Sequence, residues 1–269
     1  MPEEPTSFWQ HIDIFRKYLL RCVVVFAVVF VAVFCCKEQL FEIVFSPQQN
    51  DAFIFTFFNR IAQHFGIAPI SDVDIPIINT GLAQQFIIHV RVALVASFVL
   101  VFPYIVYQLM LFVAPALYEN EKKVTYPALI VGCLLFYVGV ALNYFFLFPL
   151  IFRFLGTYQV TNMVANYITL ESYIDTLLLL SLMMGIIFEL PILCYVLAKL
   201  DILEATFMRK TRKYAVVIIL ILSAIITPTG DAFTLFLVAL PIYLLYEISI
   251  GIVALQKKRT NAISPTLEK

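Results

Sequence analysis

Apolar residues along this 269-residue chain gather in long runs that alternate with short polar stretches. A run of about 20 apolar residues is long enough to cross a bilayer as a helix. The pattern therefore predicts an all-α polytopic membrane protein with one six-helix domain over residues 1–255 and a basic, flexible tail over 256–269. The six predicted transmembrane helices cover residues 18–36, 82–116, 124–154, 172–198, 213–228 and 232–255.

The predicted helices differ in length, and this determines the shape that we expect. The second and third would extend roughly 50 Å and 45 Å, beyond a hydrocarbon core of roughly 30 Å, whereas the fifth would extend only about 20–25 Å. Prolines inside the runs remove backbone hydrogen bonds and bend helices; they are Pro103, Pro149, Pro191 and Pro241. Tilted, bent and unequal helices favour a concave, cup-like arrangement over a closed bundle.

A long segment over residues 37–81 separates the first two helices and is expected to face outward. Its apolar stretch 53–58 fits either a strand or a helix that lies on the membrane surface. Helices of similar length do not recur in register between the two halves of the chain. The inverted repeats that are typical of secondary transporters are therefore not evident.

The composition agrees with a membrane protein. Hydrophobic residues make up 62% of the chain and charged residues 13%, and the mean hydropathy is +0.94. Soluble domains are about 45–50% apolar and about 25% charged. The net charge of zero gives no reason to expect a nucleic-acid partner. The first apolar run lacks the small-residue cleavage site of a signal peptide, so we expect a retained helix.

Basic residues are unevenly distributed between the predicted loops on the two sides of the membrane. One side has Arg16, Lys17, Arg21, Lys122, Lys123, Lys199, Arg209, Lys210, Arg212, Lys213, Lys257, Lys258, Arg259 and Lys269. The other side has the remaining four of the 18 basic residues, Lys37, Arg60, Arg91 and Arg153. The positive-inside rule then places both termini in the cytoplasm.

Glu189 is the most informative polar residue, because it interrupts the apolar run of the fourth predicted helix. No other charge lies between Asp175 and Lys199. A carboxylate near the centre of such a helix costs roughly 2.5–3.5 kcal/mol on insertion scales. Pro191 follows closely and frees the carbonyl group of Ile187, so a polar group and an open backbone lie at one depth. This favours a docking point for another polar group, although a protonated carboxyl that bonds a neighbouring helix fits the sequence too.

Three further polar residues in the apolar runs are candidates with ordinary alternatives. Glu247 in the sixth helix could pair with the basic tail or reach the membrane surface. Gln108 in the second helix could form a hydrogen bond between helices. Thr227, before Pro228, is more often simply the last residue of a helix.

Acidic residues on the predicted cytoplasmic side form a second candidate site. Asp13 precedes the first helix, and Glu119 and Glu121 lie in the turn between the second and third. A group of carboxylates can bind guanidinium groups of a partner through paired hydrogen bonds. The alternative is an ordinary solvated turn, in which each acid has a basic neighbour such as Arg16 or Lys122.

The sequence has no visible catalytic machinery. It lacks a zinc-protease H-E-x-x-H motif, a pair of intramembrane aspartates, and a glycine-rich phosphate loop. Its five cysteines are odd in number and lack metal-ligand spacing, so we expect buried structural thiols. No enzyme activity, metal or cofactor is therefore expected.

The order and spacing of several short motifs resemble the TatC family, the core receptor subunit of the twin-arginine protein translocase. The resemblance covers about residues 8–255. Its landmarks are the stretch from His11 to Arg16, Ser46-Pro47, Pro103 to Gln108, Phe112 to Tyr118 with Glu121-Lys122-Lys123, Leu135 to Gly139, Tyr144-Phe145, Phe148 to Leu150, Phe188-Glu189-Leu190-Pro191, Thr227-Pro228 with Asp231, Leu240-Pro241, and Tyr246-Glu247-Ile248.

The resemblance implies an inner-membrane protein that binds paired-arginine signal peptides of folded precursors on its cytoplasmic side. Glu121 would contact the arginine pair, with Glu119, Asp13 and Arg16 beside it. Residues inside the membrane would face single-helix TatA/TatB-like partners in a homo- and hetero-oligomer; they are Glu189, Gln108, Thr227 and Glu247. Transport would be driven by the proton-motive force.

The chain departs from the family pattern near its start and in its first outer loop. The family usually has an acid two residues before the arginine of its first motif, where this chain has Ile14 next to Asp13. The outer loop over 37–81 is longer than expected. The alternative function is a proton-coupled small-solute transporter in which Glu189 carries the proton.

Overall fold

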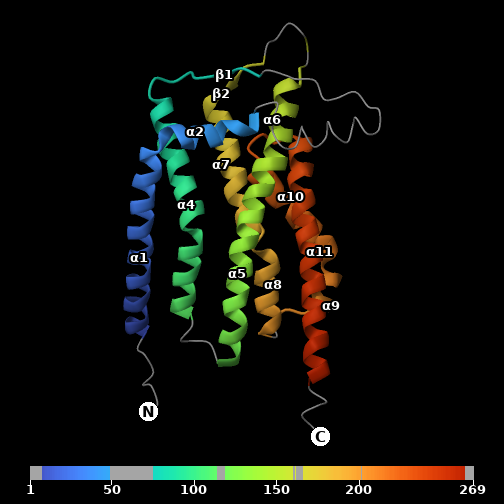
Figure 1. Ribbon diagram of the computed structural model, residues 1–269. Coiled ribbons are helices and arrows are strands. Elements are labelled where there is room, and N and C mark those ends of the chain that lie inside the picture. The colour runs from blue at the N-terminus through green and yellow to red at the C-terminus, as the bar shows by residue number, and fades with distance from the viewer. Residues whose placement is uncertain are drawn as a thin grey trace, which may run out of the picture.

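The computed structural model describes residues 8–48, 75–113, 119–159, 161, 166–200 and 202–263, with the backbone alone at 8–11, 119–125 and 257–263. Long helices run side by side through most of the molecule (Figure 1). Their bounds are α1 Phe8–Cys35, α2 Lys37–Phe45, α4 Gln84–Val113, α5 Glu119–Leu142, α6 Phe148–Thr157, α7 Leu170–Ile187, α8 Leu190–Lys199, α9 Ala205–Lys210, α10 Arg212–Ile226 and α11 Ala232–Ile263.

The described helices follow the apolar runs closely. Within the described residues, five spans are long and apolar enough to cross a membrane: Ile12–Cys35, Gln84–Val113, Tyr126–Thr157, Leu170–Lys199 and Ala232–Gln256. The third combines α5 with α6, and the fourth combines α7 with α8. The fifth predicted helix corresponds to α10, which has 15 residues and extends only about 22 Å. α11 has 32 residues and continues to Ile263, past the predicted end of the six-helix domain. The difference in length between α10 and α11 is thus larger than the sequence indicated.

Both ends of the described chain lie at one end of the molecule. α1 begins there and α11 ends there, and α4 ends and α5 begins at this end too (Figure 1). We call this end the terminal face and the opposite one the distal face. The arrangement agrees with an even number of membrane crossings.

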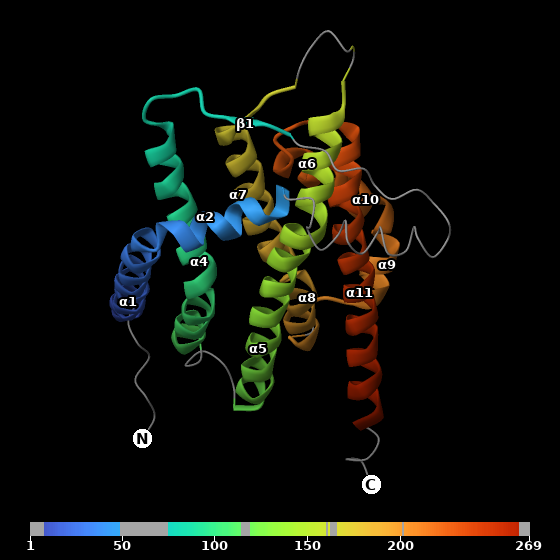
Figure 2. The ribbon, with the colours of Figure 1, turned by 45° about the horizontal axis from the view of Figure 1, so that its top comes forward.

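Two short helices and a pair of strands were not predicted. α2 lies crosswise to the long helices at the distal face, as Figures 1 and 2 show, and α9 lies beside α11. Strands β1 (Ile77–Ile78) and β2 (Ile168–Thr169) pair in parallel. They are the only strands in the described residues. The predicted surface segment over 53–58 lies outside the described residues.

The C-terminal end of α2 is attached to the long helices by two tyrosines. Tyr144 donates its hydroxyl to the carbonyl of Ile43 at 2.6 Å, and Tyr173 donates to the carbonyl of Val44 at 2.9 Å. The carbonyl of Ile43 also accepts the N–H of Ser46, so the Tyr144 hydroxyl adds a second donor at this helix end. The two hydroxyls fix α2 against the third membrane crossing, which consists of α5, the turn 143–147 and α6, and against the fourth, which consists of α7 and α8.

The third crossing contains a π turn, Asn143–Leu147, between α5 and α6. Pro149 lies in the first turn of α6, where its missing N–H group leaves an acceptor free. Asn143 is fully buried in the π turn and donates to the hydroxyl of Ser181 on α7 at 2.8 Å. The bend predicted for Pro149 is therefore accompanied by a change of helix type and a polar contact between helices.

The fourth crossing is interrupted between α7 and α8, where the sequence places Glu189 and Pro191. Phe188 and Glu189 form the connecting turn, and the Glu189 N–H donates to the carbonyl of Ile186 at 3.1 Å. Pro191 lies in the first turn of α8, a position that tolerates its missing N–H group. The predicted bend thus becomes a break two residues before the proline.

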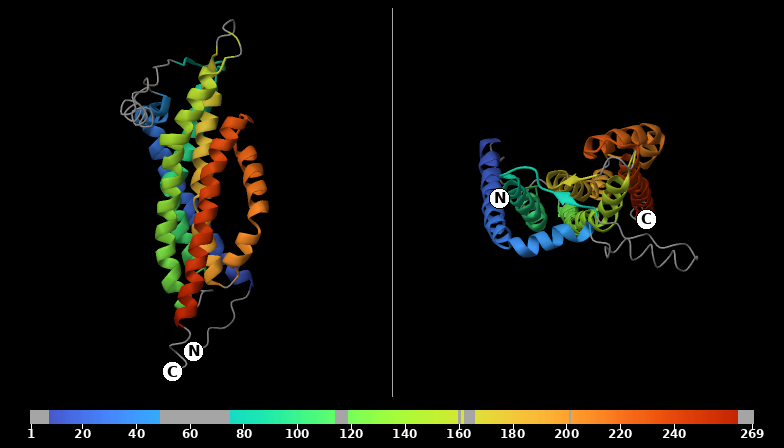
Figure 3. Two further views of the ribbon diagram at one scale, coloured as in Figure 1. Left: turned by 90° about the vertical axis from the view of Figure 1, so that its right-hand side faces the viewer. Right: turned by 90° about the horizontal axis from the view of Figure 1, so that it is seen from above.

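The long helices form an open row, with α1 at one end and α10 at the other (Figure 3). A groove of about 590 Å³ lies on one side of this row, under α2. Its walls are almost entirely apolar and come from α1, α2, α4, α7 and the third crossing; they include Val33, Ile43, Val92, Leu100 and Leu177. The groove agrees with the predicted concave shape.

Candidate functional site

The start of α1 is held against the end of α4 at the terminal face. The ring of Phe112 on α4 lies 5.1 Å from that of Phe15 and 6.5 Å from that of Tyr18, measured between centroids. Aromatic pairs at such distances contribute beyond their buried area. This contact fixes the helical turn that carries Asp13 and Arg16.

Asp13 and Arg16 are both exposed and lie three residues apart on α1, so they share one face of the helix. Ile14, where the family pattern has its acid, is 37% exposed and lies about 100° around the helix from Asp13. Glu119 and Glu121 belong to the first turn of α5 at the same end of the molecule. The side chains of these two glutamates lie outside the described part of the chain.

Glu189 lies against a glycine of the neighbouring helix. A Cβ atom added to Gly132 on α5 would lie 2.7 Å from Oε2 of Glu189, so the carboxylate occupies the space that the glycine leaves. The side chain forms no capping hydrogen bond to α8. Its other oxygen, Oε1, is buried without a hydrogen-bond partner among the described residues. Glu189 therefore has an unused acceptor inside the fourth candidate membrane span, Leu170–Lys199.

Two more glycines bring α5 and α7 close together beside Glu189. A Cβ atom at Gly139 would lie 2.5 Å from the backbone oxygen of Met184, and one at Gly185 would lie 2.7 Å from the ring of Phe136. Small residues at such contacts let membrane helices approach closely. We call the contact formed by Gly132, Gly139 and Gly185 the glycine seam. It holds the carboxylate of Glu189 at a fixed position.

Gln108 is 5% exposed and lies in the part of α4 nearest the terminal face. Its Oε1 atom is buried and, like that of Glu189, has no partner among the described residues. Among the described residues, no direct hydrogen bond joins Gln108 to Glu189. The two residues thus offer separate unused acceptors.

Thr227 ends α10 at the distal face, and its hydroxyl donates to the carbonyl of Ser223 at 2.9 Å. This is the ordinary alternative that the sequence left open. Asp231, a few residues on, accepts the Thr234 N–H at 2.7 Å and so caps the start of α11. Burial raises the pKa of Asp231, but hydrogen bonds from Thr229 and Thr234 outweigh it, and the net pKa is lowered.

Glu247 lies at the middle of α11 and pairs with Arg212 at the start of α10. The ion pair is 2.7 Å long, and the hydroxyl of Tyr243 donates to the other carboxylate oxygen at 3.1 Å. The sequence allowed a pair between Glu247 and the basic tail; the observed cation is instead the first residue of α10. Both acceptor oxygens of Glu247 are therefore engaged.

The four residues expected to face partners inside the membrane do not converge on one site. Thr227 is at the distal face, Glu247 is at the middle of α11, Glu189 lies between α7 and α8, and Gln108 lies in the part of α4 nearest the terminal face. Thr227 and Glu247 use their polar atoms within the chain. Glu189 and Gln108 keep a buried acceptor unused and remain the stronger candidates.

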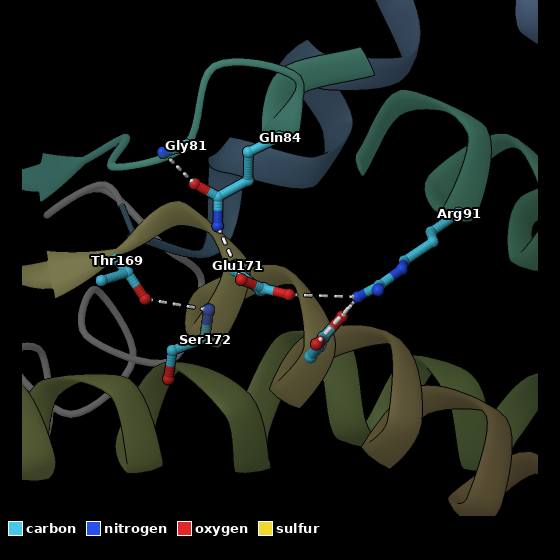
Figure 4. Close-up of polar contacts among 7 residues, drawn as sticks. Gly81, Gln84, Arg91, Thr169, Glu171 and Ser172 are labelled. Atoms are coloured by element: carbon cyan, nitrogen blue, oxygen red, sulfur yellow. Dashed lines mark hydrogen bonds and ion pairs between the residues drawn. The ribbon is translucent and has the colours of Figure 1, made fainter. Parts of the chain in front are cut away.

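A polar cluster that the sequence did not predict joins α4 to α7 near the distal face. Arg91 donates to both oxygens of Asp175, at 2.8 and 3.0 Å, and lies 3.7 Å from Glu171. Gln84 donates to Glu171 at 2.7 Å and accepts the N–H of Gly81 at 2.9 Å. Figure 4 shows these side chains meeting between the two helices.

No group of three or more metal-ligating side chains occurs within the described residues. All five cysteines are free, and the expectation that they are buried is wrong, because Cys35 and Cys36 are exposed and Cys22, Cys133 and Cys194 are only partly buried. In a membrane protein an apolar helix face can contact lipid instead of other helices. A thiol in an apolar run is therefore not necessarily in the core.

Comparison with known proteins gives one consistent family. The chain matches the family model of the Sec-independent protein translocase protein (TatC) over residues 10–241. The TatC protein of Blattabacterium sp. subsp. Periplaneta americana is 33% identical over 250 residues, covering 91% of this chain and 94% of the relative. The TatC protein of Desulforapulum autotrophicum is 31% identical over 248 residues, covering 92% and 84%.

The fold is similar to solved structures as well. A crystal structure described as the twin arginine translocase receptor TatC matches with a TM-score of 0.72 and 31% sequence identity. It covers 91% of this chain and 98% of that one. A second crystal structure of the same receptor, in the detergent DDM, matches with a TM-score of 0.72 and 30% identity, covering 90% and 98%.

Proposed function

This chain belongs to the TatC family, a multi-pass inner-membrane component of the Sec-independent protein translocase, and on this premise we propose that it is the translocase's signal-peptide receptor. It binds the paired-arginine signal peptide of a folded precursor at its terminal face, which is cytoplasmic. Together with single-helix partner subunits, in a homo- and hetero-oligomer, it supports export driven by the proton-motive force.

The observation that carries this proposal is the position of the acidic residues at the terminal face. Asp13 is exposed on a turn of α1 that Phe112 fixes against α4, and Glu121 lies in the first turn of α5 at the same end. Carboxylates bind guanidinium groups in a planar, two-bond geometry that an ammonium group cannot reproduce. Acids on two fixed helices suit a pair of adjacent arginines.

Site-specific crosslinking of an arginine-pair signal peptide tests Glu121 as the recognition residue. We expect Glu121→Gln to lower the crosslinking yield at least about tenfold, because one charge-assisted hydrogen bond to a guanidinium contributes roughly 1.5–3 kcal/mol. Glu119→Gln is the matched control, with the same change two residues away and a smaller expected loss. A peptide with a lysine pair should crosslink weakly to every variant.

Full crosslinking by Glu121→Gln in a protein that still inserts would contradict the assignment of Glu121. A loss in Glu119→Gln equal to that in Glu121→Gln would instead indicate a diffuse electrostatic attraction of the loop. Asp13→Asn separates the α1 contribution from that of α5. Receptor function itself would be excluded if none of the three variants changed the yield.

Partner docking inside the membrane is assigned to Glu189 and, secondarily, to Gln108. Each has a buried oxygen without a partner in the described residues, and the glycine seam holds the carboxylate of Glu189 in place. A polar residue of a partner helix would gain a hydrogen bond that the bilayer cannot supply. Such bonds between membrane helices contribute about 0.6 kcal/mol on average and up to about 1.7.

Copurification of a single-helix partner subunit tests this assignment. We expect Glu189→Ala to lower the recovered partner several-fold. Glu171→Gln removes an acid from the same crossing but away from the seam, and should leave recovery unchanged. Unchanged recovery in Glu189→Ala would remove Glu189 from the interface, and equal losses in both variants would show that the loss of charge, rather than its position, matters.

A further inference from the structure

The segment 199–213, which connects α8 to α10 and includes α9, concentrates positive charge. Its acidic residues are Asp201 and Glu204, and its basic residues are Lys199, Arg209, Lys210, Arg212 and Lys213. We name this segment the basic platform. We propose that it is a binding surface for anionic phospholipid headgroups in the membrane leaflet on the terminal side.

The platform is fixed to α11 through one face of α9. Ala205 and Met208 are buried in a cluster with Ile250 and Val253, and the hydroxyl of Tyr246 donates to the carbonyl of Met208 at 2.8 Å. The other face of α9 is therefore presented outward in a constant orientation. Its exposed residues are Thr206, Phe207, Arg209 and Lys210.

The depth of the platform follows from the short length of α10. The Arg212–Glu247 ion pair, 2.7 Å long, aligns the start of α10 with the middle of α11. α11 then continues to Ile263, about 24 Å further toward the terminal side. Figure 3 shows α11 extending beyond the level of α9 and α10.

A helix as short as α10 brings the membrane surface to the platform. Its length of about 22 Å is less than the hydrocarbon thickness of about 30 Å, so the bilayer thins locally or headgroups move inward around its end. Phe207 and Ile202 are 61% and 68% exposed. Apolar side chains next to cations are typical of segments that lie in the headgroup region.

The cations of the platform are largely available to a lipid. Arg212 is neutralised by Glu247, but among the described residues no ion pair involves Lys199, Arg209, Lys210 or Lys213. Each Lys or Arg close to an anionic membrane surface strengthens association roughly fivefold. This effect decays within a Debye length of about 8 Å at physiological salt, so the platform outweighs more distant charges.

Lipid selectivity of the full-length protein in phosphatidylcholine vesicles tests the proposal. Spin-labelled phosphatidylglycerol and phosphatidylcholine are compared by the fraction that the protein immobilises. We expect the unmodified protein to prefer phosphatidylglycerol and the triple variant Arg209→Gln/Lys210→Gln/Lys213→Gln to lose at least half of that preference. The preference should also fall as salt is raised.

The matched control removes the same charge from the end of α11. Lys257→Gln/Lys258→Gln/Arg259→Gln changes the net charge equally, but these residues begin about 15 Å beyond Glu247 along the helix. We expect it to retain most of the preference for phosphatidylglycerol. Equal losses in both triple variants, or no loss in the platform variant, would overturn the proposal.

A depth measurement that needs no charge removal provides an independent test. Trp9 is the only tryptophan in the chain, so Phe207→Trp in a Trp9→Phe background gives a single fluorescent probe on α9. We expect lipids brominated near the headgroup to quench it more strongly than lipids brominated near the bilayer centre. Absence of quenching would place α9 in water and would overturn the proposal even if the Gln variants failed to fold.

Discussion

Two acidic residues of the fourth crossing, Asp175 and Glu189, have opposite surroundings. Asp175 accepts two hydrogen bonds from Arg91, and its side chain is 45% exposed near the distal face. Glu189 lies against Gly132, and its Oε1 atom is buried without a partner among the described residues. The first acid is used to join helices, whereas the second keeps an acceptor free.

The difference shows that an acid in an apolar run is not informative by itself. A paired carboxylate contributes to the fold and can be replaced there by other packing. A carboxylate with a buried, unused oxygen inside an apolar helix run has a free-energy cost that the chain by itself does not offset. Such a residue points to a partner outside the chain.

The largest effect is expected from breaking the seam that holds Glu189. Gly139→Ala would place a Cβ atom 2.5 Å from the backbone oxygen of Met184, so α5 and α7 would have to separate. Overpacking of this kind lowers the free energy of unfolding by about 1–3 kcal/mol. Denaturant unfolding in detergent would measure it.

Gly251→Ala in α11 is the control for that substitution, because no atom lies within 4 Å of its added Cβ. We expect it to be neutral or slightly stabilising, since alanine favours a helix over glycine by roughly 0.5–1 kcal/mol. Equal destabilisation of both variants would mean that the seam is not tightly packed.

A smaller loss of stability is expected from breaking the Arg91–Asp175 ion pair. Arg91→Ala leaves Asp175 and Glu171 without their cation, but the side chains of Arg91 and Asp175 are 44% and 45% exposed. Exposed pairs contribute about 0.2–1 kcal/mol, so unfolding should become easier by no more than about 1 kcal/mol. Arg91→Lys should recover most of this, because both hydrogen bonds come from the single nitrogen Nη1 of Arg91 and a lysine ammonium group has three donors.

The smallest effect on stability is expected from Glu189→Gln. The amide has nearly the same shape, and the Oε1 atom has no hydrogen bond among the described residues to lose, so unfolding should change by less than about 0.5 kcal/mol. A destabilisation larger than that of Arg91→Ala would make Glu189 a structural residue and would remove the contrast with Asp175.

The helices were predictable because membrane crossings require long apolar runs, and their ends differ from the predicted ones mainly where helices extend into polar sequence. α1 begins at Phe8 rather than near residue 18, and α11 continues to Ile263. Apolar content alone cannot locate such ends. α2 was missed because Lys37, Glu38 and Glu42 make its nine residues look like a polar loop.

The sequence indicated that Glu189 lacks a partner, because no other charge lies near it in the apolar run. The packing of Glu189 against Gly132 could not be predicted, because the contact depends on how two helices meet. The Arg91–Asp175 pair joins residues 84 positions apart. From the sequence, Arg91 was counted only as one of the four basic residues on the outer side of the membrane. Thr227 was foreseen as a helix end, and membership of a protein-translocation family displaces the solute-transporter alternative.

The π turn at Asn143–Leu147 is the point at which the third crossing can lose one residue without rotating the helix after it. A π turn holds one residue more than an α turn, so it shifts the angular phase of everything after it by about 100°. Asn143 and Tyr144 are the first residues of this turn, and they contact Ser181 and the end of α2. Deleting one residue in the last part of the turn would convert it to an α turn and leave α6, including Phe148, in its present orientation, whereas the same deletion inside α6 would rotate every later residue by about 100°.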